Sequence, residues 1–230
     1  GRLLGVERRL AELIAAGTSV CGASAVIATN TVTRGSDEDV AYAIACVTVF
    51  GSLSMLAMPV LGEMLAMAPA HYGIWVGATV HEVAQVVGAG FQHSAEAGQA
   101  ATVAKLSRVM LLAPLILVLG MLARRGGDAA HGSAPTPWFV LGFIAVVVLN
   151  SALPLPEPMQ RDVVSLTAFL LTMALAAMGL ETDIRKLRAK GTRPLALGAL
   201  AWLFISGLGL GLVGLNRERP EPGRDDPGPM

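Results

Sequence analysis

A histidine and a glutamate lie next to each other in the apolar stretch GIWVGATVHEVAQVVGAG, residues 73–90. An ionisable residue at membrane depth costs about 2.5–3.5 kcal/mol on insertion scales, so it normally faces a cavity and has a function. His81 can carry a proton because histidine titrates near neutral pH, and Glu82 is beside it. On a continuous helix Gln85 would share a face with His81. We expect His81, Glu82 and Gln85 to bind or release a coupling proton or cation.

Two other interpretations of these residues stay open. A short amphipathic segment would hold His81 and Glu82 at the water interface without any function. HEVAQ also resembles the zinc motif H-E-x-x-H, in which two histidines on one helix face bind the metal. Gln85 replaces the second histidine, however, and no Cys/His cluster stands in for it. We therefore expect no metal, no other cofactor and no enzymatic activity.

A second unusual stretch is LIAAGTSVCGASAVIATNT, residues 13–31. Its glycines lower helix propensity by about 1 kcal/mol each, and its Ser and Thr side chains can cap backbone groups at a break. Two half-helices would expose N–H groups that favour an anion at the start of the second half. The alternative is close helix packing through small residues. The substrate-binding candidates are Gly17, Ser19, Cys21, Gly22 and Ser24.

The sequence has two further features of interest, a pair of cationic residues and a weak internal repeat. Lys105 and Arg108 are three residues apart, share a helix face, and either attract an anion or extend to the membrane surface. Shifting the sequence by 60 residues aligns 17–26 with 77–86, with three identities in ten. This is close to chance in so Gly- and Val-rich a chain. An inverted repeat would give it meaning, because the two interrupted segments could then meet at one site.

The elements that must position these residues are membrane helices. The chain has 230 residues, 53% of them hydrophobic and 15% charged, whereas a soluble domain carries about 25% charged residues. A bilayer core of about 30 Å requires about 20 helical residues. The sequence predicts an all-α, polytopic membrane protein with about seven membrane segments, two of them interrupted. The segments are 10–32 (interrupted), 40–62, 73–91, 106–123, 137–153, 163–180 and 194–215, within a membrane domain of residues 1–215.

Charge and the chain ends add further expectations. The net charge is zero, which argues against nucleic-acid binding. Residues 216–230 contain four prolines and alternating charges, and we expect a disordered tail. The cluster DIRKLRAKGTR, residues 183–193, favours the cytoplasm for its loop, although one re-entrant segment would change the order of sides.

Several of these stretches together resemble the bacterial YeiH family, whose label is that of a sulfate exporter. The resemblance covers about residues 10–215. It implies an inner-membrane transporter similar in fold to the bile-acid/arsenite/riboflavin and sodium–proton antiporter-like transporters, which have inverted repeats and crossing broken helices. Family members are usually longer at the N-terminus, so we expect this chain to lack their first helices. The stretches that carry the resemblance, in order, are GTSVCGASAVIA, VFGSLSMLAMPVL, GIWVGATVHEVAQVVGAG, KLSRVMLLAP, PWFVLGF and AMGLETDIRKLRAKGTRPLALG.

The sequence thus predicts a secondary active transporter of a small anion, such as sulfate, sulfite or a related sulfur oxyanion, with proton or cation coupling. Its expected partners are the anion, the coupling ion and the lipid bilayer of the bacterial inner membrane, and a homo-oligomer is left open. The competing hypothesis is a non-transporting membrane subunit that binds a partner through its helices.

Overall fold

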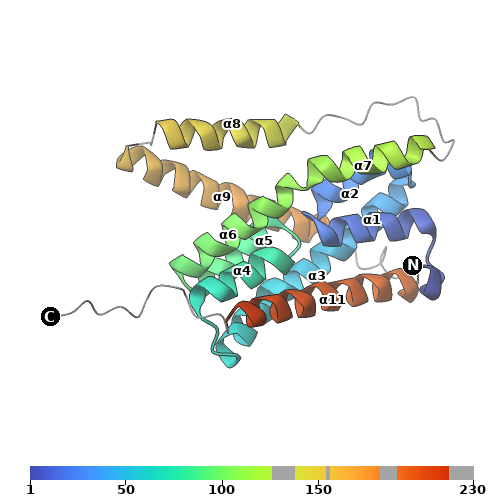
Figure 1. Ribbon diagram of the computed structural model, residues 1–230, viewed down its shortest axis with the longest axis horizontal. Coiled ribbons are helices and arrows are strands. Elements are labelled where there is room, and N and C mark those ends of the chain that lie inside the picture. Colours follow the sequence, from blue (N-terminus) through green and yellow to red (C-terminus); the bar gives the residue numbers. More distant parts are fainter. Residues whose placement is uncertain (126–137, 154–155, 182–190, 218–230) are drawn as a thin grey trace, which may run out of the picture.

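The computed structural model describes residues 1–125, 138–153, 156–181 and 191–217, and the secondary structure of these residues is entirely helical. After a 3-10 turn, η1 (Arg2–Leu4), the chain forms ten α-helices in these ranges (Figure 1). They are α1 (Arg8–Ser19), α2 (Ala23–Thr33), α3 (Asp37–Met64), α4 (Pro69–Thr79), α5 (Val83–His93), α6 (Ala95–Met110), α7 (Leu112–Arg125), α8 (Trp138–Ala152), α9 (Glu157–Glu181) and α11 (Thr192–Arg217). Of the predicted tail, residues 218–230 lie outside the described residues, and Asn216 and Arg217 end α11.

Among the residues that the structure describes, four helical stretches are long and apolar enough to cross a membrane: Asp37–Met64, Ala95–Met121, Pro158–Ala177 and Thr192–Leu215. The second combines α6 with most of α7. It starts eleven residues before the predicted segment 106–123, which places Lys105 near its middle instead of at a membrane surface. The α8 helix has 15 residues and is shorter than a full crossing.

Helices α1 and α2 form a hairpin. The interruption lies at Val20–Gly22, within the predicted stretch, but the chain reverses direction there instead of continuing across the membrane. Near the open end of the hairpin, the guanidinium of Arg9 donates to the carbonyl of Arg34 at 3.1 Å. Each helix of 11 or 12 residues is about 17 Å long, which is half of a bilayer core. The hairpin is therefore re-entrant, and the predicted crossing segment 10–32 is not formed.

Helices α4 and α5 form a second hairpin, with its tip at Val80–Glu82. The Tyr72 hydroxyl of α4 donates to the carbonyl of Ala89 in α5 at 3.1 Å, and its ring stacks on that of His93. The predicted segment 73–91 is therefore also a hairpin and not a crossing.

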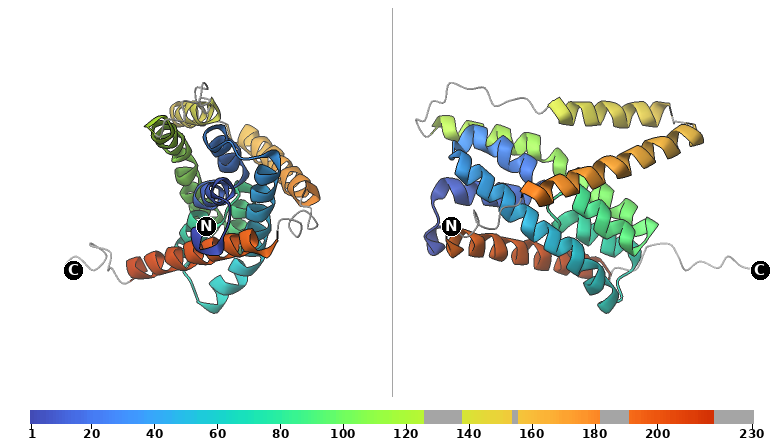
Figure 2. Two further views of the ribbon diagram at one scale, coloured as in Figure 1. Left: turned by 90° about the vertical axis from the view of Figure 1, so that its right-hand side faces the viewer. Right: turned by 180° about the vertical axis from the view of Figure 1, so that it is seen from behind.

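The helix bounds repeat with an offset of 60 residues. Moving α2 by 60 positions gives the bounds of α5, and moving the tip Val20–Gly22 gives Val80–Glu82. In each unit the hairpin is followed by a long helix, α3 in the first and α6–α7 in the second. The hairpins extend from opposite ends of the molecule, and their tips meet in the middle (Figures 1 and 2). The weak 60-residue similarity thus marks an inverted repeat.

Small residues allow the second hairpin to approach its long helix closely. Gly73 and Gly77 of α4 face the backbone carbonyls of Ala97 and Ala101 in α6, and a Cβ on either glycine would overlap these carbonyl oxygens. Helix α11 lies along the other side, where the indole of Trp75 donates to the carbonyl of Ser206 at 2.9 Å. Helices α8 and α9 lie outside this group (Figure 1). The buried core therefore surrounds the hairpins and fixes where their tips meet.

Candidate functional site at the hairpin tips

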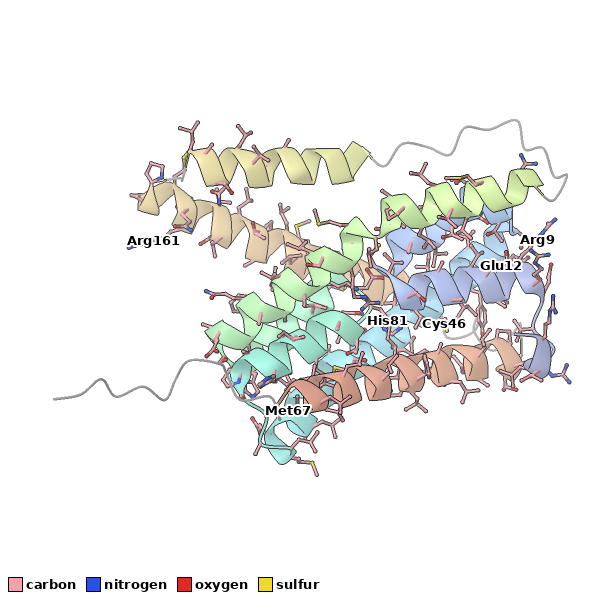
Figure 3. All side chains as sticks on the ribbon, in the orientation of Figure 1. Arg9, Glu12, Cys46, Met67, His81 and Arg161 are labelled. Carbon is pink, nitrogen blue, oxygen red and sulfur yellow. The ribbon has the colours of Figure 1, made fainter. Side chains whose placement is uncertain are left out.

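The two tips bring together residues from four helices in the middle of the molecule. Figure 3 shows His81 there, far from Arg9 and Glu12 at one end of the molecule and from Met67 and Arg161 toward the other. His81 is 1% exposed and Glu82 is 8% exposed, so neither reaches a water interface. The interpretation that this pair sits at the membrane surface is wrong for this structure.

Lys105 joins the two hairpins. Its ammonium group donates to the carbonyl of Val20 at 3.0 Å, to the carbonyl of Val80 at 2.8 Å and to the carbonyl of His81. These three bonds use all the donors of an ammonium group, which is why this fully buried side chain is tolerated. Its charge lies where α1 and α4 end, and a cation at a helix C-terminus is favoured by the helix dipole.

Arg108, one helical turn further along, makes the same kind of contact. Its guanidinium donates to the carbonyl of Thr18 at 2.9 Å and to that of Val80 at 3.3 Å. The two cations therefore share a face as predicted, but they point at helix ends inside the protein. Neither extends to the membrane surface.

Glu82 faces the opposite helix ends. Its carboxylate accepts a hydrogen bond from the backbone N–H of Ala23, the first residue of α2, at 2.8 Å. Glu82 is also the residue that precedes α5. The carboxylate thus lies at two helix N-termini, where an anion is favoured.

Gly22 makes room for this carboxylate. It has φ 72° and ψ −129°, a conformation that residues with a Cβ rarely adopt, and a Cβ here would overlap the Glu82 carboxyl group. Gly22 and Glu82 occupy equivalent positions in the two repeats, 60 residues apart. The first repeat therefore supplies backbone groups and space, whereas the second supplies all the charges.

Gln85 has a supporting position that the sequence did not indicate. Because His81 precedes α5, the two side chains do not share a helix face, contrary to the expected four-residue spacing. The Gln85 carboxamide accepts from the Glu82 N–H at 3.2 Å and donates to the carbonyl of Thr48 and the hydroxyl of Ser52, both in α3. Gln85 therefore anchors the tip of the second hairpin to α3.

The substrate-binding candidates of the first hairpin differ in their burial. Gly17, Cys21 and Gly22 are buried at or next to the first tip. Ser19 and Ser24 are exposed on the outside of that hairpin. The end of α1 is capped by the backbone N–H of Val20, which donates to the carbonyl of Ala16, and α2 begins after Gly22 without a side-chain cap.

Sequence reasoning missed the backbone partners of the charged side chains. They are the carbonyls of Thr18, Val20 and Val80 and the N–H of Ala23, groups whose residue types carry no signal. Gly51 was also missed; it leaves space for the Gln85 carboxamide. Within the residues that the structure describes, no three His, Cys, Asp or Glu side chains gather as metal ligands.

These features define a helical membrane protein in which two re-entrant hairpins from an inverted repeat meet at a buried charged cluster. The chain belongs to the family described as conserved hypothetical protein 698, whose family model matches residues 1–198. It is 45% identical over 219 residues to the UPF0324 membrane protein PA5383 of Pseudomonas aeruginosa. The match covers 90% of this chain and 62% of that protein.

The UPF0324 inner membrane proteins YeiH of Salmonella typhimurium and Escherichia coli K12 are 40% and 39% identical over 213 residues. Each match covers 90% of this chain and 61% of the relative. The chain therefore spans about three fifths of the length of these proteins. Together with its long apolar helices, its membership of this family makes it an inner-membrane protein. No solved structure matches it. The predicted resemblance to the YeiH family is confirmed.

Proposed function

We propose that this chain forms the substrate-binding part of a secondary active transporter for a small oxyanion, such as sulfate or sulfite, with proton or cation coupling. The observation that carries the proposal is the meeting of two re-entrant hairpin tips around the buried residues Glu82 and Lys105 and the partly buried Arg108. Non-helical backbone at membrane depth is tolerated where protein buries it or where it lines a water-filled cavity. Transporters use such half-helix ends to bind their substrates near the bilayer midplane.

The charges of the cluster favour an anion over a cation. Lys105 and Arg108 carry two positive charges, and Glu82 carries one negative charge. With His81 neutral the sum is +1. Two unit charges 4 Å apart interact by about 4 kcal/mol at an effective dielectric constant of 20, so one uncompensated cation is a substantial attraction for an anion.

The inverted repeat favours alternating access. Each hairpin reaches the tips from its own end of the molecule, so a small movement of one repeat against the other would open the cluster to one side at a time. Because Lys105 and Arg108 contact both tips, such a movement would change their hydrogen bonds to the carbonyls of Val20 and Thr18 in the first hairpin.

The test is anion flux into proteoliposomes that contain the full-length protein. We expect uptake of radiolabelled sulfate or sulfite above that of protein-free liposomes, and at least a tenfold loss of flux in Arg108→Met. The exposed Arg2→Met is the matched control and should retain full flux. If the folded wild-type protein moves neither anion, and Arg108→Met only changes its assembly with other proteins, the competing role of a non-transporting subunit is favoured.

A further inference from the structure

We propose that Glu82 is a tethered anion that occupies the oxyanion site, and that a transported anion binds there only as Glu82 takes up a proton and withdraws. This inference deepens the proposed function and rests on it. It makes a proton the coupling ion and makes Glu82 the residue that couples proton and anion.

The geometry of the carboxylate carries the first step. A free anion would be expected at the N-terminus of α2, but the N–H of Ala23 already donates to Glu82 at 2.8 Å. The same carboxylate lies at the start of α5, and the missing side chain of Gly22 gives it space. The side chain of the protein thus fills the position that a small oxyanion would take.

An unsatisfied group in the residue that precedes Glu82 is the second, independent observation. Nδ1 of His81 is buried and has no hydrogen-bond partner among the described residues. Buried polar atoms are normally paired, so this nitrogen indicates a partner that arrives with a ligand. An oxyanion that replaces the carboxylate could accept a hydrogen bond from Nδ1 in addition to the one from Ala23.

The surroundings of Glu82 determine the proton balance. The tips contribute Cys21 and the adjacent His81, and α6 contributes Lys105, with Arg108 one turn further along. From α3, the neutral groups of Thr48 and Ser52 reach the tip through Gln85. A second anion beside an ionised Glu82 would be repelled by it. One proton from water neutralises Glu82 as the anion binds, so the charge of the cluster stays at +1 with a monovalent anion such as hydrogen sulfite and becomes zero with divalent sulfate.

The affinity for the anion should decrease as the pH rises. Anion binding takes up a proton, so binding is strongest at low pH, where the Glu82 carboxyl group is already protonated. Above the pKa of this group, the affinity for the anion should fall by up to tenfold for each pH unit. Proton and anion then cross the membrane in the same direction.

The experiment measures binding of sulfate, whose charge does not change over this range, to the full-length protein in detergent by calorimetry between pH 5 and 8. Repeating it in buffers of different ionisation enthalpy gives the number of protons taken up. We expect about one proton per anion in the wild-type protein. In Glu82→Gln and Glu82→Ala we expect binding without proton uptake and with less than a twofold change in affinity over this range. The exposed Glu96→Gln should behave like the wild type.

Failure of this inference differs from failure of the proposed function. Anion binding by the wild-type protein without proton uptake would overturn the tethered-anion proposal and leave an anion transporter. Loss of all binding in a folded Glu82→Gln variant would also overturn it, because Glu82 would then be needed to bind the anion. If neither the wild type nor the two Glu82 variants bind or move an anion at any pH, both proposals fail.

Discussion

At the scale of single residues, the cluster sorts its charges by the helix ends that they face. Lys105 and Arg108 face the carbonyl ends of α1 and α4, and Glu82 faces the N–H ends of α2 and α5. Each charge is therefore stabilised by backbone groups of the opposite partial charge instead of by an ion pair. This arrangement makes the tips sensitive to the loss of any one charged side chain.

Replacing Lys105 by methionine should destabilise the protein strongly. The change leaves the carbonyls of Val20, Val80 and His81 buried without their donor, at a cost of about 1–3 kcal/mol for each unsatisfied group. Thermal unfolding in detergent should show a clear decrease in Tm. Arg2→Met, at an exposed position, should leave the Tm unchanged. Equal Tm values for the two variants would mean that the contacts of Lys105 contribute little.

Gly22→Ala should also be destabilising, although it adds a single methyl group. The strained backbone alone costs about 1–3 kcal/mol, and the new Cβ would overlap the Glu82 carboxyl group. Gly120→Ala, in α7, is the control because no atom lies near its added Cβ, and it should be neutral or stabilise the helix by about 1 kcal/mol. Comparing the two in the same unfolding assay checks the geometry of the first tip.

At the scale of helices, the second hairpin is held by backbone contact and the first by side chains. Gly73 and Gly77 bring α4 onto the backbone of α6, which carries Lys105. In the first hairpin a Cβ on Gly17 would meet the side chains of Val26 and Val47, which can adjust more easily than backbone. The second hairpin and α6 therefore behave as one rigid unit that presents the charges.

Gly77→Ala should separate α4 from α6, because its Cβ would overlap the carbonyl oxygen of Ala101. Overpacking of this kind costs about 1–3 kcal/mol. Since α4 ends at Val80, which binds Lys105, anion flux should fall together with Tm. Gly211→Ala, which has open space in α11, is the matched control. Full flux in a destabilised Gly77→Ala protein would show that the tips tolerate movement of α4.

At the scale of the whole molecule, the hairpins decide which ends of the chain share a side of the membrane. A crossing through residues 10–32 would place Leu3 and Asp37 on opposite sides, whereas the re-entrant hairpin places them on the same side. Positive residues agree with this arrangement. The helix ends at the Arg9 end of the molecule are η1, the start of α1, the end of α2, the end of α7 and the start of α11 (Figure 1). They carry seven arginines of the described residues, namely Arg2, Arg8, Arg9, Arg34, Arg124, Arg125 and Arg193. The opposite end has Arg161 and Arg217, so the positive-inside rule assigns the Arg9 end to the cytoplasm.

Cysteine labelling tests this topology. In a Cys21→Ala/Cys46→Ala background, a membrane-impermeant maleimide should label Leu3→Cys and Asp37→Cys only from the cytoplasmic side, and Glu63→Cys only from the other side. All three positions are exposed near helix ends. Labelling of Leu3→Cys and Asp37→Cys from opposite sides would mean that α1 and α2 cross the membrane, and the re-entrant hairpin would then be wrong.

The amino-acid sequence by itself determined the membrane class, the place of the first helix interruption and the residues that carry charge into the apolar interior. These are local properties: hydropathy decides what enters the bilayer, and residues such as Gly22 mark where a helix can end. Only the tertiary structure decided that the chain turns back at both interruptions and that Glu82 meets the N–H of Ala23. The direction of a helix after a break depends on the helices it packs against, and here the partners are backbone groups 24 to 90 residues away, whose residue types carry no signal.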